Sequence, residues 1–242
     1  MPVKMDQIRA VAFDLDGTLI DTLPDLTTAV NATLTALGAH ALPPARVKDL
    51  VGDGADKLIA RAVAEAVAEE AATDELHARA MALFLGYYAE HLFERSEVYP
   101  EAVRTLRALE EKSMRVCCVT NKSSRFALPL LELAGLGSLL ELTLCADRTE
   151  DRKPSPVLLL QACERLELIP REMLYVGDSH TDVMAAHAAG CGAVAVTFGY
   201  HKPGSLERVS PDATVSNLSQ IVSLLSSPLV APAAPRIQEV PT

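Results

Sequence analysis

The chain has 242 residues, a formal net charge of −10 and a hydrophobic content of 49%, with 4% aromatic residues and no Trp. This length fits one large domain or a core with a smaller second domain, and the composition can supply a sizeable, mostly aliphatic core. The acidic balance argues against non-specific nucleic-acid binding, which depends on Lys and Arg, although a local site can still bind a small phosphorylated molecule.

The first part of the chain predicts one strand followed by helices. Residues 11–13 form a short apolar run that is typical of a buried strand and ends at Asp14. Apolar positions at helical spacing then predict three helices, over residues 22–37, 55–67 and about 73–93. Pro43-Pro44 indicates a turn between the first two helices. Residues 22–93 are therefore expected to form an all-helical insert.

In the second part of the chain, strand and helix patterns alternate. The predicted strands cover residues 115–120, 142–145, 173–176 and 193–197. The predicted helices lie near residues 126–134, 156–166 and 185–189, and Pro100 is placed to open another helix. This alternation predicts an α/β fold with a Rossmann-like parallel sheet and helices on both faces.

These patterns also predict the domain organisation. The sheet core is expected to comprise residues 1–21 and 94–225, with residues 22–93 as a separate helical domain. Residues 226–242 are rich in Ser, Pro and Ala and are expected to be a disordered tail.

The cysteines and the N-terminus bear on location. The five cysteines show neither a CxxC pair nor metal-ligand spacing with His, so free thiols in a reduced compartment are expected. The N-terminus lacks an apolar stretch of signal-peptide length, and no run approaches the ~18 apolar residues of a membrane helix. A cytoplasmic protein without a membrane partner is the expectation.

Asp14 and Asp16, in the segment DLDGT, directly follow the first predicted strand. Two residues apart on an extended chain, they face the same side, and two close carboxylates are relieved by a hard divalent cation such as Mg²⁺. Aspartate can also attack phosphorus as a covalent nucleophile. An Asp-Gly turn that begins a helix is the other interpretation of this segment.

Three later segments carry further polar residues. Thr120 and Asn121 end a predicted strand, where a hydroxyl and a backbone N–H can hold phosphate oxygens. Lys153, before a proline, can act as a point charge on phosphate. Asp178 and Asp182, in GDSHTD, supply a second acidic pair. Each segment, taken singly, also fits a helix cap or an exposed lysine, but ligands bind at the carboxyl ends of such strands.

In this order the segments resemble the haloacid dehalogenase superfamily of aspartate-nucleophile phosphatases. The matching segments are DLDGT at 14–18, the strand that ends in Thr120-Asn121, Lys153-Pro154 and GDSHTD at 177–182. The resemblance covers about residues 8–225 and implies that the helical insert is that family's small cap domain.

The resemblance also implies a role for each site residue. Asp14 is the expected nucleophile, and Asp16 the general acid and then the general base. Asp14, Asp178 and the backbone carbonyl of Asp16 are the expected ligands of Mg²⁺. Asp182 is expected to order those ligands through waters or through Lys153. The expected phosphate-binding residues are Thr120, Asn121 and Lys153.

Within the superfamily, the full pattern is most similar to bacterial phosphoglycolate phosphatases. It includes VGDGADKL at 51–58, Tyr99-Pro100, VTNK at 119–122 and KPSPVLLL at 153–160. This similarity implies hydrolysis of 2-phosphoglycolate to glycolate and phosphate through an aspartyl-phosphate. A phosphatase for sugar phosphates, nucleotides or pyrophosphate is the alternative, followed by a phosphomutase or a non-catalytic binding protein. The expected partner is a small phosphorylated metabolite, with no nucleic acid and no membrane, and the expected state is a monomer or a small homo-oligomer.

Gly52 and Gly54 flank Asp53 just before the predicted helix at 55–67. This turn is expected to approach the substrate. Lys57 and Arg61 on that helix are candidates to meet a substrate carboxylate, but solvent exposure is the expectation for both.

Overall fold

The computed structural model describes residues 4–67, 73–202 and 204–226. Six parallel strands form one sheet in the order β5-β4-β1-β6-β7-β8. The strands are β1 (Ala10–Phe13), β4 (Arg115–Thr120), β5 (Leu142–Cys145), β6 (Met173–Gly177), β7 (Gly192–Val196) and β8 (Ala213–Val215). Because the first strand lies at the centre, between β4 and β6, later strands are added outward on both sides. The predicted α/β class is confirmed.

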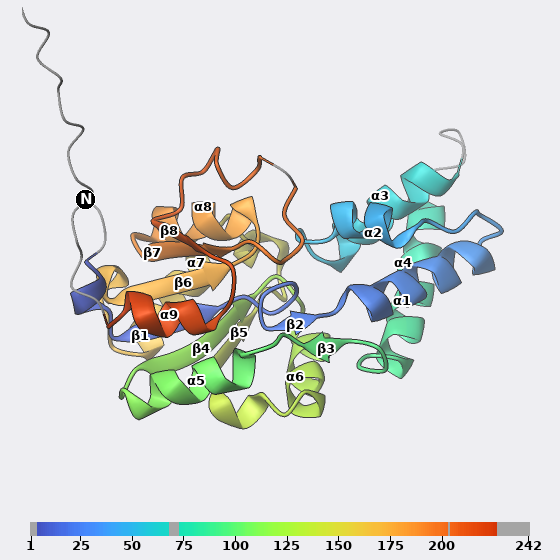
Figure 1. The fold of residues 1–242 in the computed structure, drawn as a ribbon. Helices are drawn as coiled ribbons and strands as arrows, with labels where there is room; N and C mark the ends of the chain where they lie inside the picture. The colour runs from blue at the N-terminus through green and yellow to red at the C-terminus, as the bar shows by residue number, and fades with distance from the viewer. Residues whose placement is uncertain (1–3, 68–72, 203, 227–242) are drawn as a thin grey trace, which may run out of the picture.

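Helices cover both faces of the sheet (Figure 1). They are α5 (Ala102–Glu111), α6 (Ser124–Leu133), α7 (Val157–Arg165), α8 (His180–Ala189) and α9 (Ser219–Leu224). Alternate residues of a strand point to opposite faces, so Val11 and Phe13 of β1 join one apolar cluster with α5, α6 and α9. Ala10 and Ala12 join the other cluster, with α7 and α8. Burial on both faces explains why these strands are apolar throughout.

A group of helices is inserted between β1 and β4. It consists of α1 (Leu23–Ala36), α2 (Pro44–Leu50), α3 (Ala55–Ala66) and α4 (Asp74–Glu90), which lie together at one end of the molecule (Figure 1). The chain enters and leaves this insert through an antiparallel ribbon of β2 (Ile20–Asp21) and β3 (Glu97–Val98). The two connections to the core are therefore side by side.

Asp25, in the first turn of α1, binds the segment that leads from the helical insert back to the core. Its buried carboxylate accepts hydrogen bonds from the backbone N–H groups of Glu94, Arg95 and Ser96, at 2.8–3.1 Å, and from Ser96 Oγ at 2.6 Å. These donors satisfy the hydrogen-bonding capacity of a buried carboxylate, and hydrogen bonds to an ionised group are stronger than those between neutral groups. The start of the insert and its end are thus held together by one side chain.

Several short elements differ from the sequence-based expectations. The patterns do not reveal β2, β3, β8 or α9, each of which has six residues or fewer. Pro44 begins α2 where a turn is expected, because a proline in the first turn lacks only an N–H that the helix does not use. The helix expected to open at Pro100 starts at Ala102, after Glu101 adopts a left-handed φ of 71°.

Helix α8 is longer than expected, since it begins at His180 rather than near Ala185. Ser179 and Asp182 form a reciprocal capping box at its start, which satisfies backbone N–H groups of the first turn. Four 3₁₀ segments complete the described elements: η1 (Met5–Gln7), η3 (Gly137–Leu139), η4 (Thr149–Asp151) and η5 (Pro170–Glu172).

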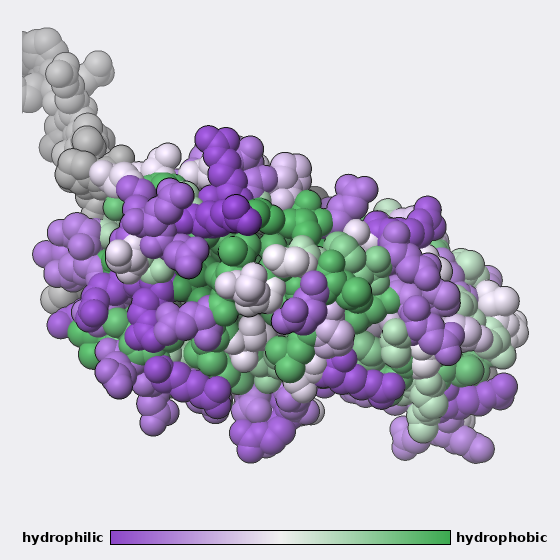
Figure 2. All heavy atoms as spheres, turned by 90° about the horizontal axis from the view of Figure 1, so that it is seen from below, coloured by the Kyte–Doolittle hydropathy of each residue, from purple (hydrophilic) through white to green (hydrophobic). Residues whose placement is uncertain are grey.

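The remaining expectations concern the surface and the tail. All five cysteines are free thiols, and only Cys145 is not fully buried. Within the described ranges, no helix has the length and apolar character needed to cross a membrane. Seen from below, the molecule carries hydrophobic side chains toward the middle of this face and hydrophilic ones around them (Figure 2). The expected disordered tail, from residue 227 on, lies outside the described residues.

Candidate active site

The site lies at the carboxyl ends of the three central strands. Asp14 directly follows β1, Thr120 is the last residue of β4, and Asp178 directly follows β6. Since connections from these neighbouring strands run to opposite sides of the sheet, their ends border the crevice where ligands bind in such folds. Lys153 reaches this crevice from the loop that follows β5, just after the 3₁₀ segment η4.

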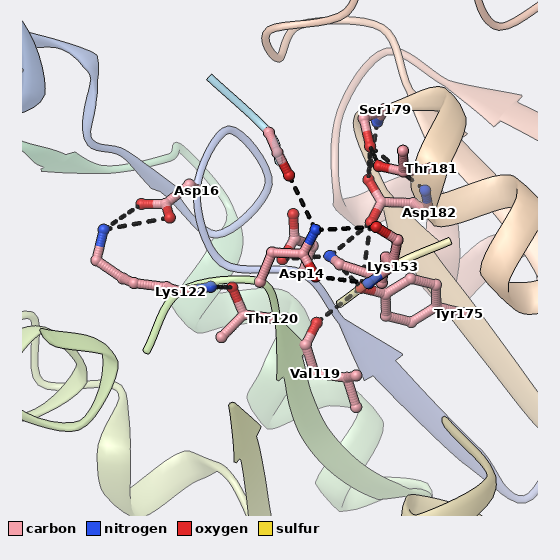
Figure 3. A network of polar contacts seen from close by, with 12 residues as sticks. Asp14, Asp16, Val119, Thr120, Lys122, Lys153, Tyr175, Ser179, Thr181 and Asp182 are labelled. Carbon is pink, nitrogen blue, oxygen red and sulfur yellow. Dashed lines mark hydrogen bonds and ion pairs between the residues drawn. The ribbon is translucent and has the colours of Figure 1, made fainter. Parts of the chain in front are cut away.

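Lys153 holds a buried network below the crevice. Its Nζ lies 2.8 Å from Asp14 Oδ1 and 2.6 Å from Asp182 Oδ1, and its side chain is 2% exposed (Figure 3). Nζ also donates to Tyr175 Oη at 2.8 Å, and that hydroxyl donates to the carbonyl oxygen of Val119 at 2.7 Å. The ammonium is therefore fixed beside Asp14 by partners from three different segments.

A second lysine, Lys122, forms an ion pair with Asp16. Lys122 Nζ lies 2.9 Å from Asp16 Oδ1 and 3.2 Å from Oδ2, and it donates to Tyr88 Oη of α4 at 2.8 Å. The hydroxyl of Thr22 donates to Asp16 Oδ1 at 2.6 Å. Asp14 and Asp16 therefore line the same cavity, as expected, but each carboxylate pairs with its own lysine. Sequence reasoning assigns Lys122 no role, although it ends the matching segment VTNK.

Two further carboxylates converge on Asp14. One oxygen from each of Asp14, Asp178 and Asp182 lies within 4.8 Å of the other two. Asp14 Oδ1 is buried and accepts no aligned hydrogen bond in the described part of the chain, although Lys153 is in ion-pair range. The carboxylate of Asp16 is not part of this cluster, so only its backbone carbonyl remains a candidate ligand.

The electrostatics of the cluster show how crowded it is. Burial raises the pKa of Asp14 to about 6; the Lys153 ion pair opposes this shift, and the charge of Asp182 adds to it. Burial, with the charges of Asp182 and Asp14, raises the pKa of Asp178 well above its ordinary value. Burial also acts on Asp182, but Lys153 and the Ser179 hydrogen bonds outweigh it and lower the pKa. Oxygen donors that repel one another in this way fit a hard divalent cation such as Mg²⁺.

Asn121 joins three loops. Its Oδ1 accepts from the backbone N–H of Lys153 at 2.8 Å, and its Nδ2 donates to the carbonyl oxygens of Gly52 at 3.0 Å and Lys153 at 3.3 Å. The Asn121 side chain is thus committed to structure, which leaves its backbone for the expected contact with phosphate. Thr120, 1% exposed, accepts from the backbone N–H of Lys122 through Oγ1.

The tight turn expected at Gly17 is present, with a φ of 81°. A Cβ at Gly17 or at Gly199 would overlap the carboxylate of Asp178. Asp178 also accepts a short hydrogen bond from the backbone N–H of Tyr200. The position of this carboxylate therefore depends on two glycines that are far apart in the sequence.

A cavity of about 230 Å³ opens above these residues, between the sheet and the helical insert. It is lined from the core by Asp14, Asp16 and Asp178, and from the insert by Gly52, Gly54 and Tyr88. The volume is below the ~300–1,000 Å³ of pockets for drug-sized ligands, so it suits a small metabolite. The turn at Gly52–Gly54 reaches the site as expected, whereas Lys57 and Arg61 are exposed.

Comparisons with known proteins agree with this geometry. Residues 8–190 match the haloacid dehalogenase-like hydrolase family. The chain is 40% identical over 233 residues to phosphoglycolate phosphatase of Chromobacterium violaceum, covering 93% of this chain and 100% of that protein. It is 39% identical over 218 residues to phosphoglycolate phosphatase of Nitrosospira multiformis, covering 90% and 96%.

Among solved structures, that of a predicted phosphoglycolate phosphatase from Haemophilus somnus 129pt superposes with a TM-score of 0.85 at 32% identity, over 90% of this chain and 98% of that one. The family match covers most of the sheet and the whole helical insert. The resemblance read from the four motifs is thereby confirmed: the chain belongs to the haloacid dehalogenase-like hydrolases.

Proposed function

We propose that the chain is a magnesium-dependent phosphatase that hydrolyses 2-phosphoglycolate to glycolate and phosphate. The observation that carries this proposal is Asp14, a buried carboxylate that lines a small cavity with Lys153 at 2.8 Å and two further carboxylates beside it. The substrate follows from relatives of nearly equal length, both named phosphoglycolate phosphatase, at 40% and 39% identity.

In the first step, an Asp14 carboxylate oxygen attacks phosphorus, and the bond from phosphorus to the glycolate oxygen breaks. Asp16 gives its proton to that leaving oxygen, so glycolate departs neutral at the hydroxyl. Lys153, the Thr120 hydroxyl and the Asn121 backbone N–H bind the phosphoryl oxygens. Such positioning and charge neutralisation supply most of the catalysis in phosphoryl transfer.

In the second step, a water attacks the phosphorus of the aspartyl-phosphate. Asp16 takes the proton from this water, the bond from phosphorus to Asp14 breaks, and phosphate leaves. Asp16 must therefore stay in one place through both steps. Lys122 and Thr22, at 2.9 and 2.6 Å from its Oδ1, hold it there.

Asp14, Asp178 and the backbone carbonyl of Asp16 would hold Mg²⁺. Asp182 would order this set from behind, since it is fixed by Lys153 and by two hydrogen bonds from Ser179 to its Oδ2, at 2.6 and 2.9 Å. When bound, the ion supplies positive charge to the acidic cluster and to the phosphoryl oxygens.

We also propose that residues 22–93 act as a cap over a core of residues 1–21 and 94–225. The contact of Tyr88 with Lys122 supports this division, because it joins helix α4 of the insert to the carboxylate-bearing side of the core. A cap that approaches the core in this way excludes water and selects the leaving group. The five free thiols fit the expected cytoplasmic location.

The test is a comparison of kcat/KM for 2-phosphoglycolate with values for sugar phosphates, nucleotides and pyrophosphate, with Mg²⁺ present. We expect 2-phosphoglycolate to be hydrolysed most efficiently and excess chelator to abolish turnover. A clear preference for another phosphomonoester would contradict the substrate assignment. Transfer of the phosphoryl group back to a sugar would indicate a mutase, and turnover in excess chelator would refute the metal requirement.

A further inference from the structure

The cations that line the cavity are not equally available to a ligand. Lys122 is occupied by Asp16 and Tyr88, at 2.9 and 2.8 Å. Lys153 lies underneath, 2% exposed, between Asp14 and Asp182. Arg152, the other cation of the cavity wall, pairs with no carboxylate within the described ranges, and its Nε is buried without a hydrogen-bond partner.

Arg152 is held at the boundary between the core and the helical insert. An ideal Cβ built on Gly54 would lie 3.2 Å from both Cζ and Nε of Arg152, so the guanidinium packs against the backbone of Gly54. The next residue in this loop, Lys153, is fixed through its backbone by Asn121, which also binds the carbonyl oxygen of Gly52. The Arg152 side chain is therefore held in place by its packing against Gly54 and by the fixed backbone of the next residue.

The charge of the cavity creates a need for such a group. Asp14, Asp16, Asp56 and Asp178 all line it, so a ligand that carries a second anionic group meets repulsion from several sides. A guanidinium matches a carboxylate with two parallel hydrogen bonds and cannot lose its charge near neutral pH. Arg152 is the side chain of the cavity wall with both the charge and the unused donors that a carboxylate requires.

We propose that Arg152 binds the carboxylate of the substrate and thereby selects a carboxylated phosphomonoester over a neutral one. This inference rests on the proposed hydrolysis of 2-phosphoglycolate, and it assigns the part of that substrate which does not react. Gly54 allows this close packing, because a Cβ there would lie only 3.2 Å from the guanidinium and would press against it.

The experiment compares 2-phosphoglycolate with ethyl phosphate, in which a methyl group replaces the carboxylate, for the wild type and for Arg152→Gln with Mg²⁺ present. A hydrogen bond to a charged group contributes about 1.5–3 kcal/mol, so Arg152→Gln should lower kcat/KM for 2-phosphoglycolate by about 10- to 160-fold. The loss should appear mainly in KM, because the carboxylate does not react. The value for ethyl phosphate should stay within twofold.

Two further variants sharpen the comparison. Arg152→Lys keeps the positive charge but not the paired N–H donors of the guanidinium. Compared with Arg152→Gln, it should recover part of the preference for 2-phosphoglycolate. Arg148→Gln is the matched control: Arg148 lies in the same loop, is exposed and pairs with Asp151 at 2.8 Å, so both kinetic constants should stay at wild-type values.

Each contrary result has a distinct meaning. An equal loss on both substrates overturns the proposal, because Arg152 would then act on the phosphate or on the loop. A preference for 2-phosphoglycolate that survives Arg152→Gln assigns the carboxylate to another residue and overturns it as well. A wild-type enzyme that hydrolyses both substrates equally well overturns the proposed function itself, and the role of Arg152 with it.

Discussion

Lys122 Nζ lies 2.9 Å from Asp16 Oδ1, and this contact gives Asp16 a cationic partner different from that of Asp14. The two carboxylates are neighbours in sequence, yet Asp14 is paired with Lys153 and joins the acidic cluster, whereas Asp16 is paired with Lys122 and stands outside it. In the proposed mechanism, Lys153 thus stabilises the nucleophile beside the metal ligands, and Lys122 fixes the acid-base group.

Replacing Lys122 with Met should impair both stability and turnover. The side chain of Asp16 is 17% exposed, and removing one partner of a buried ion pair costs about 3–5 kcal/mol. We expect the free energy of unfolding in urea to fall by part of this amount and kcat to fall at least tenfold, because Asp16 loses its orientation. Lys57→Met, at an exposed position on α3, is the control and should change neither quantity. A Lys122→Met enzyme with wild-type kcat would refute the positioning role.

Tyr88→Phe removes the hydroxyl through which α4 contacts Lys122. Burial raises the pKa of Tyr88 to about 12, so the group is a neutral hydroxyl at physiological pH. The donor is the charged Lys122 ammonium, and a hydrogen bond to a charged group contributes about 1.5–3 kcal/mol. Its loss predicts a fall of at least about tenfold in kcat/KM for 2-phosphoglycolate. Tyr87→Phe, one residue earlier on α4, should have no effect, and equal effects of the two changes would argue against a specific role of Tyr88.

Asp14→Asn should abolish turnover while the protein stays folded. The amide is nearly isosteric with the carboxylate but cannot form the acyl phosphate. Circular dichroism should remain that of the wild type, and hydrolysis of 2-phosphoglycolate should fall below detection. Asp14→Ala, which cannot revert by deamidation, is the companion variant. Activity retained by both would refute Asp14 as the nucleophile.

The same substitution predicts a pH effect on the stability of the metal-free protein. An acid whose pKa is raised on folding keeps its proton longer in the folded state, so the folded state loses relative stability as the pH rises from about 4 to about 6. Burial raises the pKa of Asp14 from 3.8 to about 6. This shift lowers the free energy of unfolding by about 3 kcal/mol over that pH range.

Asp14→Asn lacks this contribution. In chelator, the free energy of unfolding of the variant should therefore gain on that of the wild type between pH 4 and pH 7, and Mg²⁺ should restore the wild type. Urea unfolding at several pH values measures the difference. A difference that is independent of pH would show that Asp14 titrates alike in the folded and unfolded chains.

Gly54→Ala tests the packing of Arg152 from the other side. Gly54 has a φ of +90°, and its Cβ would meet the Arg152 guanidinium, whereas Gly38 has a φ of +76° with nothing within 4 Å. Both alanine variants bear the backbone strain, of order 1–3 kcal/mol, but only Gly54→Ala should raise KM for 2-phosphoglycolate. In an Arg152→Gln background this increase in KM should disappear, which a double-mutant cycle measures. If Gly38→Ala raises KM equally, strain alone is the cause.

Much of the fold follows from local patterns. Alternating strands and helices predict the α/β class, and the strands that carry Asp14, Thr120 and Asp178 are found where expected because they are apolar on both faces. The two-residue strands β2 and β3 have no periodicity to detect, since their pairing depends on contacts between segments far apart in the chain. The same limit applies to Asp25, whose donors lie about 70 residues later.

The site shows a similar division. Its carboxylates and Lys153 stand in recurring segments, so their order along the chain reveals them. In the sequence, Lys122 and Arg152 cannot be told from other lysine and arginine residues in loops. Their roles depend on the helical insert that packs above them. Tyr88 of the insert then accepts a hydrogen bond from Lys122, and the backbone of Gly54 packs against Arg152. Such roles come from the relative placement of two substructures, which no local pattern contains.

The ribbon of β2 and β3 brings the two ends of the helical insert side by side. Because Ile20 pairs with Val98 and Asp21 with Glu97, the helical insert begins and ends at nearly the same point of the core. A different insert can therefore replace this one by a single genetic exchange, because the order of the strands in the sheet stays the same. Such a replacement would leave Asp14, Thr120 and Asp178 of the core in place and change only the wall of the cavity that faces them.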